Sequence, residues 1–361
     1  MSNYPFSVII LRSLEEFDIH AESWNDLWNR STCSNPTARA ETLSLFCKSK
    51  KKKQKFITVI IQDEKKKWVA AIPLIEEIRF KVIRCAVSPR LISACLLVDP
   101  EVDVVAVIRL LIHEIRNNMP YHWICAESVR LESFEWALFI SILSEFRIDH
   151  ASVRTHRVSL ISLDGQVEDL LKKWNQEKIK DVRRLLRKIS KIGKLEFVED
   201  TSSYDVLGNL QTCFDIENLG WKGNDDKKGM SIIKRDQVSY FTQNAILLTQ
   251  CNNMYLFRLV LNGQLVAFQY NFGAKNTIYC NKIGYNPEFK KYSPGFLLHL
   301  LVFEYLIRNR TQFKVFDYVG EFKEYQVHWN PKFDLAGFII FPTSSFIGRI
   351  FFKMYSYFRQ I

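Results

Sequence analysis

The spacing of apolar and polar residues divides the first half of the chain into short helices and strands. Apolar residues recur at helical spacing over 102–118 and 133–146. Two apolar runs at 55–63 and 67–78 flank a short polar segment, which is typical of a β-hairpin. A further apolar run closes this half as a strand at 151–163. The first half is therefore predicted to be a mixture of α and β structure.

The pattern changes near residue 165, where a long basic helical stretch begins and continues to residue 197. Its apolar residues recur in steps of three and four, which places them on one helix face: Val182, Leu185, Ile189 and Ile192. Between residues 172 and 194 there are ten basic residues against Glu177 and Asp181, so the local charge is 10 − 2 = +8. Gly193 is predicted to cap the end of the helix.

From residue 254 onward the predicted order of elements is β-β-β-α-β. The hairpin at 254–273 has Asn262 and Gly263 between two apolar strands, the pair best suited to a type I′ turn. The other predicted elements are a strand at 277–286, a helix at 296–307, a strand at 313–321 and an amphipathic helix at 346–361.

Composition limits the classes of protein that the chain can belong to. Its 361 residues are 47% hydrophobic and 25% charged, which fits one large globular domain or two of ordinary size. The net charge of +11 favours a phosphate-rich ligand, a nucleic acid or an anionic membrane as partner. None of the eight cysteines forms a C-x-x-C pair, so we expect neither a metal site nor a thioredoxin-like motif.

The start of the chain and the lengths of its apolar runs indicate where the protein is located. We find no signal peptide at the start and no run near the roughly 20 apolar residues of a membrane span. A cytoplasmic protein is therefore predicted, with peripheral contact at the inner membrane as an alternative.

A tight turn at residues 290–295 is the first candidate for chemistry. Ser293, Pro294 and Gly295 follow two lysines and precede an almost wholly apolar helix. The first N–H groups of a helix lack partners within it and carry partial positive charge, so this end is suited to a pyrophosphate. The alternative is an ordinary Ser-Pro helix start with no ligand.

Several motifs in order then resemble a known family. They are "GWKG" at 220–223, "VAFQYNF" at 266–272, "KIGYNPEFKKYSPGFLLHLLVFEYL" at 282–306, "VFDYVGE" at 315–321 and "EYQVHW" at 324–329. Together they resemble the GNAT-like acetyltransferases of the CelD type, which are associated with cellulose and other exopolysaccharide synthesis and related to the Fem aminoacyl transferases. The resemblance covers about residues 174–335.

The resemblance implies an α/β (α+β) fold of two GNAT-like lobes, each a mixed, mostly antiparallel sheet flanked by helices. A degenerate N-terminal lobe at 1–165 would precede an acyltransferase lobe at 166–361 that carries the C-terminal amphipathic helix. The implied co-substrate is acetyl-CoA or a longer acyl-CoA. Its predicted binding residues come from the turn and the preceding strand: Lys290, Lys291, Ser293, Pro294, Gly295, Phe296, Leu297, Lys282, Ile283 and Gly284.

Two positions depart from the family pattern. Ser293 stands where the acyl-CoA loop has its first glycine, and Gln326 follows Tyr325 where typical members have lysine. Because these positions would contact the donor or the acceptor, a non-catalytic, degenerate transferase is one alternative.

Three residues are candidates for the transfer chemistry. Asp317 ends an apolar strand and would be a base or an anchor for the acceptor, with Glu217 as a further base candidate. Tyr325 would protonate the departing thiolate. For each of them a structural role is the alternative. Of the seven histidines, only His328 is expected to lie near the site.

The acceptor is predicted to contact aromatic and basic side chains near the same site: Trp221, Lys222 and Trp329. An aromatic face beside an ammonium suits a sugar or an anionic acceptor, whereas packing in the core is the alternative. The predicted reaction is transfer of an acyl group from acyl-CoA to a sugar, a polyamine or a peptidyl acceptor, small or carrier-linked. A Fem-type reaction using aminoacyl-tRNA is the alternative, and apart from that tRNA we expect no nucleic-acid partner.

Overall fold

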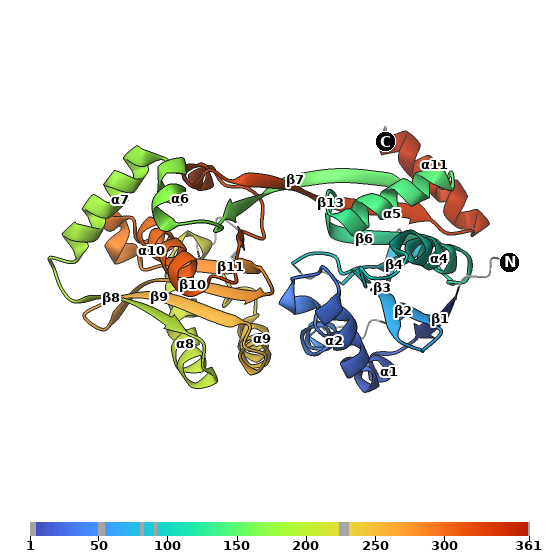
Figure 1. Cartoon of the computed structure of the whole chain (residues 1–361), viewed down its shortest axis with the longest axis horizontal. Coiled ribbons are helices and arrows are strands. Elements are labelled where there is room, and N and C mark those ends of the chain that lie inside the picture. The colour runs from blue at the N-terminus through green and yellow to red at the C-terminus, as the bar shows by residue number, and fades with distance from the viewer. Residues whose placement is uncertain (1–4, 50–54, 80–82, 90–91, 224–230, 360–361) are drawn as a thin grey trace. The chain divides into compact units, whose positions relative to one another are not determined.

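The computed structural model describes residues 5–49, 55–79, 83–89, 92–223 and 231–359. The chain forms two compact units, and each has a mostly antiparallel sheet flanked by helices (Figure 1). Unit 1 contains residues 1–157 and 334–361, and unit 2 contains residues 158–333. The predicted fold class, two lobes of mixed α and β structure, is confirmed.

The sheet of unit 1 has the strand order β1-β2-β3-β4-β6-β13, with β5 paired to β3. All the pairs are antiparallel except β4 with β6. These strands are β1 (Phe6–Leu11), β2 (Phe56–Asp63), β3 (Trp68–Arg79), β4 (Ile83–Val87), β5 (Leu97–Val98), β6 (Trp123–Arg130) and β13 (Lys332–Pro342). The helices are α1 (Leu14–Ile19), α2 (Ala21–Arg30), α3 (Ala40–Lys48), α4 (Val104–Asn117) and α5 (Phe134–Glu145).

The predicted hairpin and helices of this half are present. The runs at 55–63 and 67–78 form β2 and β3, which pair antiparallel. Asp103 caps α4 by accepting a hydrogen bond from the N–H of Ala106, and the apolar face of the helix packs into the core. The short strands β1, β4 and β5 were not predicted, because runs of two to six residues give little periodic signal.

The C-terminal segment belongs to unit 1. Strand β13 pairs with β6, from Ala336 opposite Arg130 to Pro342 opposite Trp123. Helix α11 (Phe346–Arg359) docks on this sheet, where the indole N–H of Trp123 donates to the carbonyl of Gly348 at 2.9 Å. A side chain at Gly348 would place its Cβ 2.3 Å from the His122 carbonyl oxygen, so only glycine permits this approach.

The structure therefore differs from the predicted segment 166–361, which attached this tail to the second lobe. The boundary at residue 165 rested on a change in composition, and composition carries no information about which strand β13 pairs with. The division into lobes at 1–165 and 166–361 stays a prediction.

The sheet of unit 2 has the order β7-β12-β11-β10-β9-β8, with β11 and β12 parallel and the other pairs antiparallel. Its strands are the end of β7 (Ala151–Ser162), β8 (Leu195–Asp200), β9 (Met254–Leu261), β10 (Gln264–Ala274), β11 (Thr277–Tyr285) and β12 (Val315–Asp317). Its helices are α6 (Val167–Lys173), α7 (Gln176–Ile189), α8 (Ser203–Leu219), α9 (Val238–Gln250) and α10 (Pro294–Asn309). In Figure 1, α6, α7 and α10 lie on one face of this sheet and α8 and α9 on the other.

The long basic stretch is two helices. It breaks at Asn175, whose side chain accepts a hydrogen bond from the N–H of Lys178 and so caps α7. Trp174 just before it is buried against Phe303 and Trp329. A periodicity of 3.6 continues through such a break, which is why the sequence pattern missed it.

Gly193 does not cap the helix, because α7 ends at Ile189 with Ser190 as its cap. Its role is steric: a Cβ at Gly193 would lie 2.2 Å from the side chain of Asn262. Asn262 and Gly263 have φ values of 48° and 81°, so the predicted type I′ turn is confirmed.

The remaining expectations from composition concern thiols, metals and membrane spans. All eight cysteines are free thiols and most of them are buried. Within the described ranges, no group of three or more His, Cys, Asp or Glu side chains could hold a metal ion. No helix in the described part of the chain has both the length and the apolar character that crossing a bilayer requires.

Candidate active site

Unit 2 contains a cavity of about 700 Å³. It is lined by α8, β10, β11, the turn before α10, the first residues of α10 and the segment 318–326. Most of the lining is apolar, with a few polar groups, as is usual for small-molecule sites. Many of the predicted site residues meet here.

The turn at the head of α10 has a specific backbone geometry. Ser293 adopts a left-handed conformation with φ 50° and ψ 53°, and Pro294 starts the helix. The N–H groups of Phe296 and Leu297 donate to the carbonyl of Ser293, and proline has no N–H. The N–H of Gly295 has no hydrogen-bond partner in the described residues, as we expected for the first amides of the helix. A Cβ added to Gly295 would meet nothing within 4 Å, so a ligand can approach this backbone.

The predicted cofactor residues divide into two groups. Those that line the cavity are Ile283, Gly284, Lys290, Ser293, Pro294, Gly295 and Phe296. Those that do not are Lys282, Lys291 and Leu297. Leu297 is a core residue, and Lys291 is exposed with its ammonium 5.1 Å from the ring centroid of Tyr292.

Lys282 faces away from the cavity because of the strand's alternation and a bulge. Its ammonium lies 5.1 Å from the ring centroid of Phe241 in α9, and burial lowers its pKa. Tyr270 pairs with Lys282 whereas Asn271 pairs with Cys280, so Asn281 is an extra residue in β11. The bulge brings both Cys280 and Asn281 to the cavity.

Glu217 and Lys222 form a buried ion pair at the cavity wall. The ammonium of Lys222 lies 2.8 Å from Glu217 Oε1 and also donates to the carbonyl of Ile283 at 2.8 Å. The second carboxylate oxygen, Oε2, accepts a hydrogen bond from the N–H of Ile232 at 3.0 Å. Because both oxygens of Glu217 are engaged, this carboxylate is held as a structural link between α8 and β11.

His299 is a cavity residue that the sequence analysis missed. It is buried in α10 with its Nδ1 2.7 Å from the carbonyl oxygen of Gly295, four residues earlier. Because a carbonyl oxygen only accepts, Nδ1 carries the proton and Nε2 presents a lone pair. Within the described residues, Nε2 has no hydrogen-bond partner. Burial lowers the pKa of His299 to about 4, so the ring is neutral at pH 7.

Two tyrosines complete this end of the cavity. The ring of His299 stacks on Tyr318 at 5.5 Å and lies 6.0 Å from the ring of Tyr325. The hydroxyl of Tyr318 is buried without a partner in the described residues, and burial raises its pKa. Burial also raises the pKa of Tyr325 to about 12, so its hydroxyl keeps its proton at neutral pH and can donate it.

Asp317 and Trp329 lie outside the cavity lining. Asp317 is buried at the end of β12, where its Oδ1 accepts a hydrogen bond from the N–H of Val319 at 2.5 Å. Trp329 is fully buried and packs against Trp174, Phe303 and His299. The side chain of Trp221 lies outside the described residues.

Gln326, which departs from the family pattern, has a structural role. Its Oε1 accepts hydrogen bonds from the hydroxyl of Ser159 at 2.8 Å and from the N–H of Lys323 at 3.1 Å. The amide therefore ties the 3₁₀ turn at Glu324–Trp329 to β7. A lysine, having no acceptor, could not make these two bonds.

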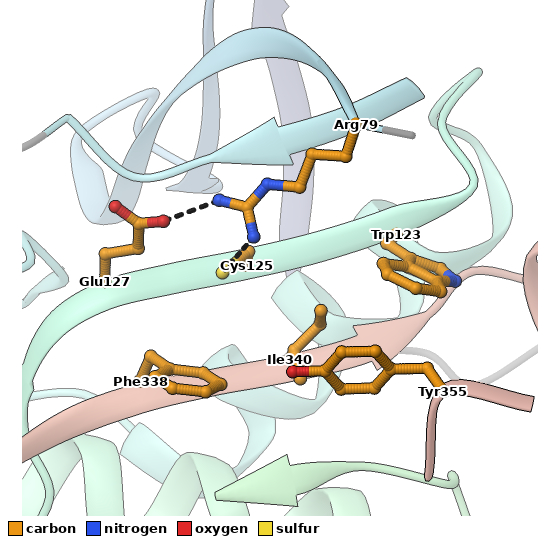
Figure 2. A pocket seen from close by; sticks show the side chains of 7 residues that line it. All are labelled: Arg79, Trp123, Cys125, Glu127, Phe338, Ile340 and Tyr355. Atoms are coloured by element: carbon orange, nitrogen blue, oxygen red, sulfur yellow. Dashed lines mark hydrogen bonds and ion pairs between the residues drawn. The ribbon is translucent and has the colours of Figure 1, made fainter. Parts of the chain in front are cut away.

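Unit 1 has a smaller cavity of about 190 Å³, which Figure 2 shows. Its polar groups satisfy one another, since Arg79 donates to Glu127 at 2.5 Å and contacts the sulfur of Cys125. Burial raises the pKa of the Cys125 thiol to about 12, so it is not a nucleophile at neutral pH. The larger cavity in unit 2 is therefore the better candidate for an active site.

Comparison with known families agrees with this choice. Residues 176–327 match the family model described as an acetyltransferase (GNAT) domain, and all the residues that line the larger cavity lie within that range. No curated protein sequence matches the chain. The match supports an acyltransferase and confirms the GNAT part of the predicted resemblance, whereas the CelD type stays a prediction.

Solved structures extend the likeness to nearly the whole chain. FemX superposes with a TM-score of 0.64 at 11% identity, covering 92% of this chain and 98% of that one. A conserved protein of unknown function from Bacteroides thetaiotaomicron gives 0.56 at 16% identity, covering 94% and 99%. L-PGS from Bacillus licheniformis gives 0.53 at 12%, covering 94% and 96%. At such low identities the likeness shows a shared fold.

Proposed function

We propose that the protein is an acyl-CoA-dependent N- or O-acyltransferase that transfers the acyl group directly to its acceptor. The observation that carries this proposal is the turn Ser293–Gly295, which opens α10 at the wall of the 700 Å³ cavity. The partial positive charge of the helix N-terminus, the free N–H of Gly295 and the ammonium of Lys290 suit the diphosphate of coenzyme A. The family match over 176–327 supports the same donor.

In the proposed reaction, an amine or hydroxyl attacks the thioester carbonyl, a new C–N or C–O bond forms and the C–S bond breaks. The Nε2 of His299 accepts the proton of the attacking group, and Tyr325 gives its proton to the departing sulfur. Gly295 orients His299 through its carbonyl, as a base needs. Holding both substrates together contributes up to about 7–11 kcal/mol, and a base adds about 10²–10⁴-fold.

His299 is a better candidate base than the carboxylates predicted from the sequence. Both oxygens of Glu217 are engaged, and Asp317 lies outside the cavity lining. Lys222 forms an ion pair with Glu217, so its ammonium can contact the acceptor only when that ion pair breaks. The cavity-facing rings of Tyr318 and Tyr325 are then the aromatic surfaces on offer to a sugar, a polyamine or a peptidyl group.

The pathway belongs to the same proposal. By its resemblance to the CelD type, the acceptor is proposed to be a precursor of an exopolysaccharide or a cell-surface glycan, small or carrier-linked. A cytoplasmic location with peripheral membrane contact is proposed with it.

Thermal stabilisation by coenzyme A thioesters tests the donor. Acetyl-CoA or a longer acyl-CoA should raise the melting temperature. At a hundredfold excess of ligand over Kd, the free energy of unfolding should rise by about 2.7 kcal/mol. Lys290→Glu should weaken the shift and Ser293→Trp should remove it by filling the turn. Lys65→Glu, the same charge change on an exposed residue of unit 1, should leave the shift unchanged. Equal shifts in all four proteins, or none with any acyl-CoA, would contradict the proposal.

Transfer from aminoacyl-tRNA is the second candidate, and helix α7 favours it. This helix exposes a row of basic side chains opposite its buried face. If α7 binds tRNA, affinity should fall steeply with salt, because each neutralised phosphate releases counterions. Affinity that does not change with salt, or the absence of tRNA binding, would remove this candidate. Binding of acyl-CoA without product from any acceptor would instead favour a non-catalytic partner protein.

A further inference from the structure

Helix α11 at the end of the chain presents an apolar face to solvent. Its exposed apolar side chains are Phe346 (70% exposed), Ile347 (49%), Ile350 (43%) and Met354 (49%). At 100° per residue these four positions fall within about 100° of the helix circumference. A surface helix ordinarily has polar residues on the side that faces solvent, so an apolar stripe on that side of α11 is unusual.

The opposite face of α11 is already used by the fold. Gly348 and Phe352 are buried against unit 1, with Phe352 at 6.0 Å from the ring of Trp123. These two positions lie on the other side of the helix from the exposed apolar four. The helix is thus apolar on both sides, and its docking on unit 1 leaves the outer stripe uncovered.

Charge beside the stripe indicates what covers it. Arg349 and Lys353 flank the apolar face, and both are exposed. Residues 335–361 contain no Asp or Glu at all. In a symmetric dimer through this face, the basic residues of the two copies would lie close together without acidic partners, which disfavours a second copy as the occupant.

We propose that the outer face of α11 docks the protein on an anionic lipid surface. Phe346, Ile347, Ile350 and Met354 enter the boundary between headgroups and acyl chains, and Arg349 and Lys353 lie at the lipid phosphates. An isolated interfacial helix has a polar face in contact with water. In α11 the corresponding face packs on the rest of unit 1 instead. This inference names a surface for the peripheral membrane contact that is part of the proposed function, and its evidence is the surface of unit 1 and not the transfer reaction.

Co-sedimentation of the full chain with lipid vesicles tests the proposal. We expect binding to vesicles of equal parts phosphatidylglycerol and phosphatidylcholine, and much weaker binding to phosphatidylcholine alone. Ile350→Gln should weaken binding about tenfold, because it removes apolar surface that would be buried. Replacing Arg349 and Lys353 by Gln should weaken it about fivefold per residue, and added salt should reduce the difference.

A matched control distinguishes binding through α11 from binding through any exposed apolar residue. Ile78→Gln removes an exposed isoleucine from β3, elsewhere on unit 1, and should leave vesicle binding unchanged. Equal binding by wild-type protein and Ile350→Gln, or an equal loss in Ile78→Gln, would overturn the proposal. A dimer in solution that Ile350→Gln dissociates would also overturn it and assign the face to a second copy.

Discussion

At the residue scale, His299 shows how a side chain gains a chemical role from its surroundings. In the sequence it is one histidine in an apolar helix and has no nearby partner to suggest a function. In the structure, the carbonyl of Gly295 fixes its tautomer, and the rings of Tyr318 and Trp329 stack on it. His299 lines the cavity, and its Nε2 lone pair has no hydrogen-bond partner in the described residues, which suits it to accept a proton.

Burial of neutral His299 should make stability depend on pH. Its pKa falls from 6.5 to about 4 on folding, so between these values the unfolded chain binds more protons. Stability should therefore rise with pH across this window, by about 3 kcal/mol in all. Urea unfolding at a series of pH values measures it.

Two variants test this pH dependence. His299→Asn keeps a donor near the Gly295 carbonyl and removes the titration, so the slope between pH 4 and 6.5 should flatten. His113→Asn, at an exposed histidine of α4, should keep the wild-type slope. If His299→Asn has the same slope as the wild-type protein, the histidine is not buried in its neutral form.

At the element scale, the site depends on how α8 is fixed to β11. The "GWKG" motif supplies Lys222, and its ammonium joins Glu217 of α8 to the carbonyl of Ile283 in β11. Gly284 of β11 also lies close to α8, because a Cβ added to it would be 3.3 Å from the Cα of Glu217. The motif was predicted to contact the acceptor, and its contacts in the structure are within the fold.

Removing Lys222 should destabilise the protein strongly. Lys222→Met leaves the carboxylate of Glu217 buried without its cation, which costs about 3–5 kcal/mol. Adding Glu217→Gln should restore much of the loss, because the buried charge is then gone. Urea unfolding of the two single variants and the double variant measures the coupling.

An exposed pair provides the comparison for Lys222. Lys172→Met breaks the solvent-exposed contact with Asp169 and should change stability by less than about 1 kcal/mol. A loss for Lys222→Met no larger than this would assign Lys222 a role at the surface, in contact with the acceptor.

At the scale of the whole molecule, the two ends of the chain build one unit. Residues 334–361 complete the sheet of unit 1 through β13 and cover Trp123 through α11. Unit 2, with the candidate active site, is a continuous segment between them. The chain therefore passes from unit 1 into unit 2 and back.

Fragments should distinguish the two descriptions of the domains. We expect residues 158–333 to resist proteolysis, because they include Leu160–Ser162, which pair with β12. Residues 166–361 lack that strand and carry β13 and α11 without their partners in β6. Limited proteolysis with mass spectrometry should show early cleavage after residue 333 in the longer fragment. Greater resistance of 166–361 would favour the boundary predicted from composition.

The sequence by itself determined the local features of this protein. Periodicity located α4, α5 and α10, the Asn262–Gly263 pair specified its turn, and the ordered motifs identified the GNAT domain. Each of these signals depends on residues within a few positions of one another or on the order of motifs along the chain, so none of them requires the tertiary structure. The turn at Ser293–Gly295 was predicted for the same reason.

Which side chains line the cavity and which hold the fold depends on contacts between residues far apart in the chain. His299, Tyr318 and Cys280 line it, whereas Trp329 and Asp317 do not. The tertiary structure also assigned the C-terminal segment to unit 1. Strand pairing, the bulge in β11 and burial join residues far apart in the chain, and the physical properties that depend on them, the pKa of a histidine or the exposure of an apolar stripe, arise only when those residues meet.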